Sequence, residues 1–144
     1  ISVSVAHAES NCPAAVASFG TGCSGSAGSV DLATNDLPWL GSKVVSATTG
    51  MTASSLAVQV VGVQGLNVPL PLGAAGCSLL VDPLALELLI PSGGVAPGEF
   101  RVPNNLGLLG QTLLLQVVGV ELGATFALQQ TTSSNALQLT VGAF

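Results

Sequence analysis

The residue types of nucleophilic catalysis are present in this sequence, but they are not arranged in a catalytic motif. His7 is the single histidine, and it falls in the polar segment "HAESNCP" at residues 7–13. The serine-rich stretch "GCSGSAG" at residues 22–28 departs from the G-x-S-x-G pattern of a nucleophile elbow and lacks its strand-to-helix context. We therefore expect a protein that is not a Ser-His-Asp enzyme.

The chain has seven carboxylates, and two pairs of them could carry chemistry. Glu87 and Glu99 would serve a glycoside hydrolase only if the fold brought them together, so we interpret both as surface charges. Asp31 and Asp36 lie in "DLATND" and are candidate calcium ligands, because calcium prefers oxygen-rich loops. They lack the EF-hand spacing, and such residues are common at turns for local hydrogen bonding alone. The sequence thus predicts no enzyme, no cofactor and no metal.

Three cysteines, Cys12, Cys23 and Cys77, allow one disulfide bond in an oxidising compartment and leave one thiol over. A Cys23–Cys77 bond would close a long loop, worth roughly 4 kcal/mol, and a Cys12–Cys23 bond a short one, worth roughly 3 kcal/mol. These energies do not choose between the two pairings. The absence of a C-x-x-C pair or a His-Cys cluster argues against a zinc site.

The composition restricts the partners of the chain. Hydrophobic residues make up 49% of its 144 residues and charged residues only 6%, against about 25% in an average soluble domain. Lys43 and Arg101 are the only basic side chains, and the net charge is -5. Such a chain can neutralise neither a nucleic-acid backbone nor an anionic membrane surface, so we expect neither partner.

The apolar residues are not arranged to cross a membrane. The most apolar stretch, "LLVDPLALELLIP" at residues 79–91, is interrupted by Asp82, Pro83 and Glu87, whereas a spanning helix needs about 20 apolar residues. We therefore expect no membrane insertion. The chain opens on Ile1 rather than Met and has no basic and apolar leader, which predicts a mature secreted protein, extracellular or at the cell surface.

Short apolar runs separated by Gly, Pro, Asn or Ser recur along the chain, and the helix-favouring residues Glu, Lys and Arg are scarce. This pattern predicts an all-β fold, an antiparallel β-sandwich of the jelly-roll or Ig-like type, with about nine to ten strands. The expected strands are residues 1–6, 42–48, 55–63, 78–81, 85–90, 98–102, 111–121, 125–131 and 136–141, with 30–33 as a tenth. Hairpin turns are expected at residues 122–124 and 133–135, and residues 64–77 are expected to be an extended connection.

The pentapeptide QVVGV occurs twice, at residues 59–63 and 116–120. Its flanks share no further pattern, which indicates two separate long strands rather than a duplicated domain. Both strands are apolar on both faces except for Gln59 and Gln116, a pattern typical of strands that are covered on both sides. Because only one face of each sheet is internal in a two-layer sandwich, we expect a loop, a further domain or, preferably, another subunit to cover the second face.

Strict alternation marks the N-terminal strand, with Ile1, Val3 and Val5 on one face and Ser2 and Ser4 on the other, followed by Ala6. Such a strand can pair within its own sheet, or it can add to an open sheet edge of a neighbouring copy. We expect residues 1–17 to be an exchanged strand and its hinge, and residues 18–144 to be a single β-sandwich domain. Cys12, in the hinge, is a candidate cross-link between copies.

Three motifs occur in order between about Ser18 and the C-terminal end: "ASFGTGCSGSAGSV", "VPLPLGAAGCSLLV" and "RVPNNLGLLGQTLLLQ". In them the chain resembles a poorly characterised domain of large secreted proteins of planctomycetes and similar environmental bacteria. The matching residues are Phe19, Gly20, Gly22, Cys23, Gly25, Ser26, Gly28, Pro69, Leu70, Pro71, Leu72, Gly76, Cys77, Leu79, Val81, Pro103, Asn104, Leu109, Gly110 and Gln116. The resemblance implies an extracellular β-sandwich without known catalysis, and it implies a Cys23–Cys77 bond because both motif cysteines match these positions. In that family the domain usually ends a much longer chain; here it nearly fills the chain, which favours a self-sufficient building block.

These observations predict a non-catalytic structural subunit of a bacterial surface, which self-assembles through its N-terminal strand into a fibre or surface layer. The partner is then a second copy of the chain. The alternative is a carbohydrate-binding or surface-attachment module with a polysaccharide as its partner. Trp39, in "LPWLG", is the candidate contact, because an exposed tryptophan can stack on a sugar ring, whereas a buried one anchors a core.

Overall fold

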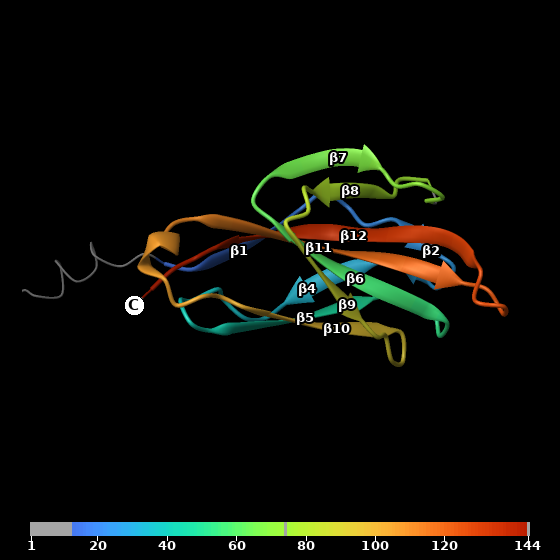
Figure 1. The fold of residues 1–144 in the computed structure, drawn as a ribbon, viewed down its shortest axis with the longest axis horizontal. Coiled ribbons are helices and arrows are strands. Elements are labelled where there is room, and N and C mark those ends of the chain that lie inside the picture. Colours follow the sequence, from blue (N-terminus) through green and yellow to red (C-terminus); the bar gives the residue numbers. More distant parts are fainter. Residues whose placement is uncertain (1–12, 74, 144) are drawn as a thin grey trace, which may run out of the picture.

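The computed structural model describes residues 13–73 and 75–143 of the chain. Within these residues the secondary structure consists of twelve strands and one short 3-10 turn, and the paired strands are antiparallel. Figure 1 shows the strands stacked in layers. The prediction of an all-β, antiparallel sandwich is confirmed. The strands at residues 15–19, 24–25, 28–29 and 65–69 were not expected, whereas the two strands expected at residues 125–131 and 136–141 form one continuous strand, Leu128–Thr140.

Two sheets form the body of the molecule. The larger sheet has the order β1-β12-β11-β6-β9, and the smaller one has the order β10-β5-β4. The strands of the larger sheet are β1 (Ala15–Phe19), β6 (Ser55–Gly62), β9 (Ala85–Leu89), β11 (Thr112–Leu122) and β12 (Leu128–Thr140). The smaller sheet contains β4 (Asp31–Thr34), β5 (Lys43–Thr49) and β10 (Val95–Arg101). The remaining elements are the hairpin of β2 (Ser24–Gly25) and β3 (Gly28–Ser29), the hairpin of β7 (Gly65–Pro69) and β8 (Ser78–Val81), and the 3-10 turn η1 (Leu106–Leu108).

The main core lies between the two sheets. Strand β5 has one face toward the interior: Val44, Ser46 and Thr48 are buried, and the residues between them are exposed, as alternation along a half-buried strand requires. The larger sheet supplies long aliphatic residues from its central strands, and Met51 fills the space beyond the end of β5. The buried members of this core are Val30, Leu32, Met51, Ala57, Leu89, Ala96, Leu115, Val117, Leu137 and Leu139.

The hairpin β7–β8 covers part of the outer face of the larger sheet, as Figure 1 shows. Strand β8 contacts β12, β11 and β6, and a second buried cluster lies beneath it, made of Val60, Val81, Leu114 and Ala136. The expectation that another subunit covers this face is therefore wrong for these three strands, because the chain covers them itself. Residues 64–77 are correspondingly more than a connection, since residues 65–69 pair with β8. Pro69 is tolerated because it stands at the end of β7, where its missing N–H is not needed.

The hairpin turn expected at residues 133–135 is not present. Strand β12 runs through these residues, and its register against β11 shifts by one residue between Gln116 and Val118, which is a β-bulge. The polar side chains that suggested a turn are used inside the sheet: Ser134 Oγ accepts a hydrogen bond from Val117 N–H at 3.0 Å. Asn135 Oδ1 accepts a hydrogen bond from Leu32 N–H at 2.8 Å. These side-chain partners allow a polar run to stay in the strand rather than leave it.

Strand β1 begins within the segment that was expected to be the hinge. Residues Ala15 to Phe19 pair with β12 from Thr140 to Ala136, so β1 forms one edge of the larger sheet. The strand runs across the expected domain boundary between residues 17 and 18, and residues 15–17 belong to the sandwich. In the part of the chain that the structure describes, no helix is long and apolar enough to cross a membrane.

Candidate functional site

The structure brings some of the candidate residues together and leaves others apart. The expected assembly strand, Ile1 to Ala6, and the candidate cross-link Cys12 lie outside the described residues. Cys23 and Cys77 form a disulfide bond with a Cα–Cα distance of 5.0 Å, so the pairing implied by the resemblance is confirmed. The bond joins the segment before β2 to the segment before β8, which are 54 residues apart in the sequence.

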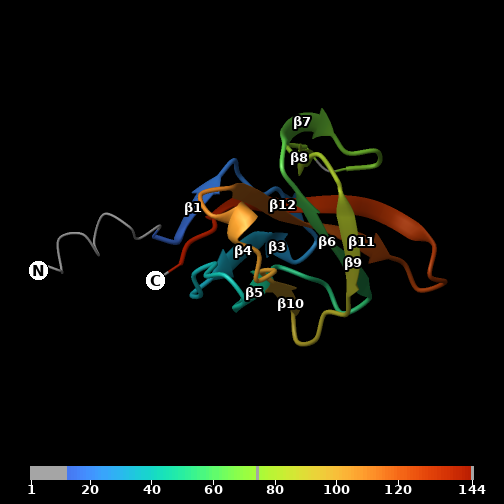
Figure 2. The ribbon, with the colours of Figure 1, turned by 60° about the vertical axis from the view of Figure 1, so that its left-hand side comes forward.

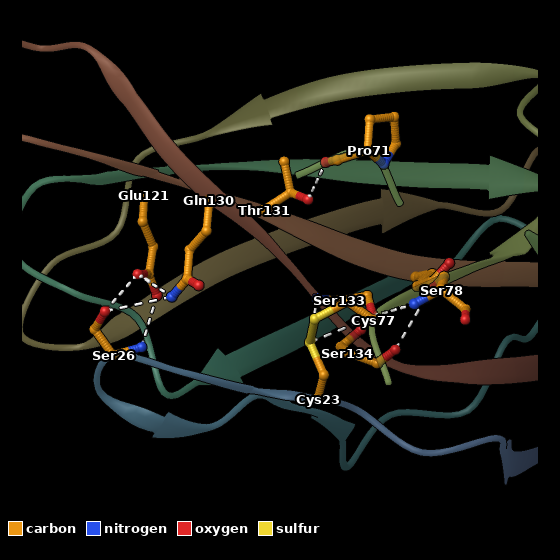
Figure 3. The surroundings of a disulfide bond; sticks show 11 residues. Cys23, Ser26, Pro71, Cys77, Ser78, Glu121, Gln130, Thr131, Ser133 and Ser134 are labelled. Carbon is orange, nitrogen blue, oxygen red and sulfur yellow. Dashed lines mark hydrogen bonds between the residues drawn. A yellow bond between two sulfur atoms is a disulfide. The ribbon is translucent and has the colours of Figure 1, made fainter. Parts of the chain in front are cut away.

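The disulfide bond crosses β12 at Ser133, as Figure 3 shows. The Ser133 N–H donates to Cys23 Sγ at 3.2 Å, and the Ser133 carbonyl accepts from the Cys23 N–H at 2.9 Å. The Ser133 hydroxyl accepts a hydrogen bond from the Ser78 N–H at 3.0 Å. Ser133 is fully buried, and the two segments that the disulfide bond connects provide hydrogen-bond partners for its N–H, carbonyl and hydroxyl groups, as buried polar groups require. This clasp fixes the β7–β8 hairpin to the sheet and is a structural feature, not a reactive one.

A buried carboxylate lies next to this clasp. Glu121, on β11, is 6% exposed and accepts hydrogen bonds from the Ser26 hydroxyl at 2.7 Å, the Ser26 N–H at 3.0 Å and Gln130 Nε2 at 2.8 Å. Burial raises the pKa of the Glu121 carboxyl, but these three hydrogen bonds outweigh burial and lower the pKa below its usual value. Figure 3 shows the three side chains pointing toward one another. Glu121 therefore holds the β2–β3 hairpin on the sheet as an ionised acceptor.

The glycines around Cys23 have a spatial reason. A Cβ atom at Gly22 would collide with the carbonyl oxygen of Val30, and one at Gly25 would collide with the Glu121 carboxylate. Ser26 and Cys23 are the two residues of the motif "GCSGS" that bond to the sheet. The motif thus attaches the β2–β3 hairpin to the rest of the sandwich, through the hydrogen bonds of Ser26 and the disulfide bond of Cys23.

The two aspartates that were candidate calcium ligands lie at opposite ends of β4. Asp31 is opposite Thr49 in the register, whereas Asp36 follows the strand and accepts a hydrogen bond from the Val45 N–H at 2.7 Å. Asp36 thus caps a turn, and the register does not bring it to Asp31. In residues 13–73 and 75–143 no group of three or more His, Cys, Asp or Glu side chains is placed to hold a metal ion. A hollow lined by Thr34, Asn35 and Asp36 lies beside this turn.

The single tryptophan is partly buried at the end of the molecule near the C-terminal residues. Trp39 forms an isolated bridge with Gly142, and the neighbouring Leu40 N–H donates to the Gly142 carbonyl at 2.9 Å. The Ser42 hydroxyl donates to the Trp39 carbonyl at 2.7 Å. The backbone around Trp39 therefore holds Gly142 against the β4–β5 connection, and the residue is half-buried.

The other two carboxylates considered for catalysis lie on different sheets. Glu99 shares the outer face of the smaller sheet with exposed Val45 and forms an ion pair with Lys43, with Nζ and Oε2 3.5 Å apart. Glu87 is on β9 of the larger sheet, opposite the buried Gln59. The two side chains are therefore set on separate surfaces of the sandwich.

Exposed aliphatic side chains occupy every second position along β9 and the residue that flanks it on either side. Leu84, Leu86, Leu88 and Ile90 are 72%, 65%, 60% and 63% exposed. They occupy alternate positions, so they share one face, and Leu86 and Leu88 pair with Val60 and Val58 on the face that the β7–β8 hairpin covers farther along. This row, residues 84, 86, 88 and 90, is called the β9 row below. It continues the outer apolar face beyond the β7–β8 hairpin, and Figure 2 shows β9 leading away from β8.

The sequence contained a signal for each feature that its analysis missed. Glu121 is the only acidic residue on the long apolar strand β11, which is unusual enough to indicate a specific partner. The β9 row is visible as aliphatic residues at every second position of "LALELLI", and residues 85–90 were expected to form a strand, but no exposed apolar face was predicted for that strand. Gln116 is fully buried and bonds to β8, whereas in the sequence it is only a polar exception on an apolar strand.

No protein-family model, no curated protein and no solved structure matches the chain. The class that the fold defines is an all-β sandwich closed by a disulfide bond.

Proposed function

We propose that this protein is a non-catalytic, extracellular structural subunit that self-associates through its N-terminal strand, Ile1 to Ala6, into a fibre or surface layer. The observation that carries the proposal is the β9 row, four aliphatic side chains on and directly beside the edge strand β9 that are each at least 60% exposed. Contiguous exposed apolar surface of this kind marks an interaction site in a stable protein. An exposed apolar edge strand in particular is a template for pairing with another chain.

The disulfide bond and the charge content support the extracellular part of the proposal. Disulfide bonds persist in oxidising compartments, and the Cys23–Cys77 bond is buried at both cysteines. The resemblance to a secreted bacterial domain points to the same location. With only 6% charged residues, the protein has little of the like-charge repulsion that keeps subunits apart.

Size-exclusion chromatography and negative-stain microscopy of the full chain test the proposal. We expect polymers, and we expect the full-length double variant Val3→Asp/Val5→Asp to be monomeric, because it places charges on the apolar face of the expected strand. The matched control is Ala8→Asp/Ser10→Asp in the expected hinge, which should still assemble. A monomeric parent protein at high concentration would refute self-association, and assembly of the Val3→Asp/Val5→Asp variant would refute the role of the strand.

The alternative function is binding of a polysaccharide, and the partial exposure of Trp39 favours it. Trp39 is half-buried as a residue, and a tryptophan that is not fully buried can stack on a sugar. The hollow at Asn35 and Asp36 adds polar groups on the neighbouring β4–β5 turn. Retention on immobilised polysaccharides that is lost in Trp39→Ala, but kept in Leu106→Ala, would support this function. Passage of the parent protein through every polysaccharide column without delay would exclude it.

A further inference from the structure

We propose that the free edge of β9 is the acceptor for residues Ile1 to Ala6 of a second copy, and that the resulting contact is head-to-tail and open-ended. This inference rests on the proposed self-association and adds the receiving surface and the symmetry of the assembly. Three features support it: the character of the four edges of the two main sheets, the alternation of both partners and the order of the strands.

Three of the four sheet edges carry features that discourage strand addition. Strand β10 has Pro97, Glu99 and Arg101 among its exposed positions, and proline and charge are the residues that protect an edge. Strand β4 begins with the exposed Asp31 and has only four residues. Strand β1 exposes alanine and serine, which offer little surface to an added strand. Proline is absent from β9, and Glu87 is its one charge.

The β9 row lies uncovered next to the edge of the sheet. The hairpin strand β8 contacts β12, β11 and β6, while Leu86 and Leu88 are 65% and 60% exposed beyond it. On the opposite face of the same strand Leu89 is buried in the main core, so β9 is firmly part of the sandwich. A strand that pairs with β9 would therefore meet aliphatic side chains on one face, and on the other face Ala85 and Glu87.

The sequence of the expected assembly strand has the complementary alternation. Ile1, Val3 and Val5 would lie beside the β9 row, and Ser2 and Ser4 would lie beside Ala85 and Glu87. Cross-strand pairs of β-branched and aliphatic residues stabilise neighbouring strands, and alternate side chains determine which face of an added strand points inward. A shift by one residue would reverse the faces, so the alternation selects one set of registers.

The order of the strands makes such a contact propagate. Residues 1–12 lead into β1, which is one edge of the larger sheet, and β9 is the opposite edge. Strands β12, β11 and β6 separate them, a distance of roughly 19 Å at about 4.8 Å per strand. Figure 2 shows β1 and β9 on different sides of the molecule. Each copy would thus donate from one edge and accept at the other, which is a heterologous contact that builds an open chain unless its rotation closes a ring.

Cysteine cross-linking tests the contact in the full chain. In a Cys12→Ser background, the double variant Val3→Cys/Leu86→Cys places two thiols on the same face of the proposed strand pair. Mild oxidation should give a ladder of covalent multimers on a non-reducing gel, with the linking peptide identified by mass spectrometry. The matched control Ser4→Cys/Leu86→Cys places the thiols on opposite faces and should give at least about tenfold less ladder, since opposite faces of a strand cannot meet.

A second pair of variants separates the edge assignment from self-association. Leu86→Lys/Leu88→Lys should weaken association by more than about tenfold, because it removes apolar contact and adds charge to the edge. Leu106→Lys, which changes a leucine that is 75% exposed on η1, should assemble normally. Circular dichroism and disulfide mapping of Cys23–Cys77 show that each variant is folded.

The outcomes distinguish a failure of the β9 assignment from a failure of self-association itself. If Val3→Asp/Val5→Asp abolishes assembly while Leu86→Lys/Leu88→Lys and the cross-linking pair have no effect, the N-terminal strand is exchanged but β9 does not accept it. If the cysteine pair forms only a cross-link within one chain, the strand folds back on its own sheet and the head-to-tail contact is refuted. If the parent protein is a monomer, self-association itself fails.

Discussion

Gln59 and Gln116 hold the same place in the two copies of QVVGV, yet their side chains lie on opposite faces of the larger sheet. The two strands are antiparallel neighbours in which Gln59 is paired with Val117 and Gln116 with Val60. Gln59 therefore faces the smaller sheet, where its Nε2 donates to the Glu99 carbonyl at 3.2 Å. Gln116 faces the β7–β8 hairpin. The repeat is thus a repeat of sequence and not of environment.

The two glutamines are expected to differ in their contribution to stability. Gln116 makes three hydrogen bonds, to the Leu80 N–H at 2.8 Å, the Ser78 carbonyl at 3.0 Å and the Ser134 carbonyl at 2.9 Å. Gln116→Met keeps the volume but leaves these groups unpaired, so the free energy of unfolding should fall by about 3 kcal/mol. Chemical denaturation followed by circular dichroism measures the change.

Gln59→Met is the matched control for that experiment. Gln59 makes one hydrogen bond through its amide nitrogen, and its Oε1 is buried without a hydrogen-bond partner. Replacing it should therefore cost about 1 kcal/mol or less, since one unpaired oxygen is removed along with one bond. Equal losses in Gln59→Met and Gln116→Met would show that Gln116 does not clamp the hairpin.

The glycine of the first QVVGV copy is expected to be required by a close approach of the backbone. A Cβ atom at Gly62 would collide with the carbonyl oxygen of Asp82, where the chain passes from β8 to β9. Gly62→Ala should lower the free energy of unfolding by about 2–3 kcal/mol, because backbone has to move to make room. Gly65→Ala is the control, since its added Cβ would have only Leu80 O nearby, at 3.7 Å. Thermal unfolding of both variants measures the difference, and similar melting temperatures would contradict it.

The sequence predicted the class of the fold because alternation and turn residues are local signals. Residues 78–81 were bounded correctly, and strands β5, β6 and β11 were each found to within a residue at either end. The polar run at residues 133–135 misled the same reasoning. Side chains such as Ser134 and Asn135 favour turns when they form hydrogen bonds with their own segment. Here they accept hydrogen bonds from β11 and β4, and such long-range partners cannot be identified from the sequence.

The candidate site could be predicted only in part, because burial depends on the order of the strands. The covalent clasp was implied by two motif cysteines, and it formed as implied. That β9 would be an edge strand, with its aliphatic row exposed, required knowledge that β6 pairs with both β11 and β9. Likewise, Glu121 meets Ser26 across 95 residues of sequence, a contact that spacing cannot indicate.

The disulfide bond is expected to be a main source of stability in this small sandwich. It closes a loop of 54 residues, so the chain-entropy account assigns it about 4 kcal/mol. We expect Cys23→Ala/Cys77→Ala to lower the midpoint of guanidinium denaturation correspondingly, and to release the β7–β8 hairpin first, since the bond fixes that hairpin to β12. Hydrogen exchange measured by mass spectrometry should show faster exchange at residues 65–81 than in the central strands. Unchanged exchange in this segment would show that hydrogen bonds alone hold the hairpin.

The buried carboxylate gives stability that should depend on acid. The pKa of Glu121 is lowered in the folded protein relative to about 4.3 for an unperturbed glutamate, so the unfolded chain binds the proton more readily. The stabilisation is therefore complete above the unfolded value and is lost as the pH falls through the folded value. The free energy of unfolding of the parent protein should decline below about pH 4.5. In Glu121→Gln this part of the decline should be absent, because the residue no longer titrates.

Removing the Ser26 hydroxyl tests whether its hydrogen bond lowers the pKa of Glu121. Ser26→Ala removes the hydroxyl that donates to Glu121 at 2.7 Å and leaves Gln130 in place. The pKa of Glu121 should then rise, because burial continues to favour the neutral carboxyl while one of the opposing hydrogen bonds is gone. The acid-sensitive decline in the stability of Ser26→Ala should therefore be smaller than that of the parent protein and should end at a higher pH, because only the folded-state pKa changes. Urea denaturation at half-unit steps between about pH 3 and about pH 7 measures both curves, which cover the range in which a glutamate titrates. Coincident curves for the parent protein and Ser26→Ala would mean that Ser26 does not hold Glu121 in its ionised form.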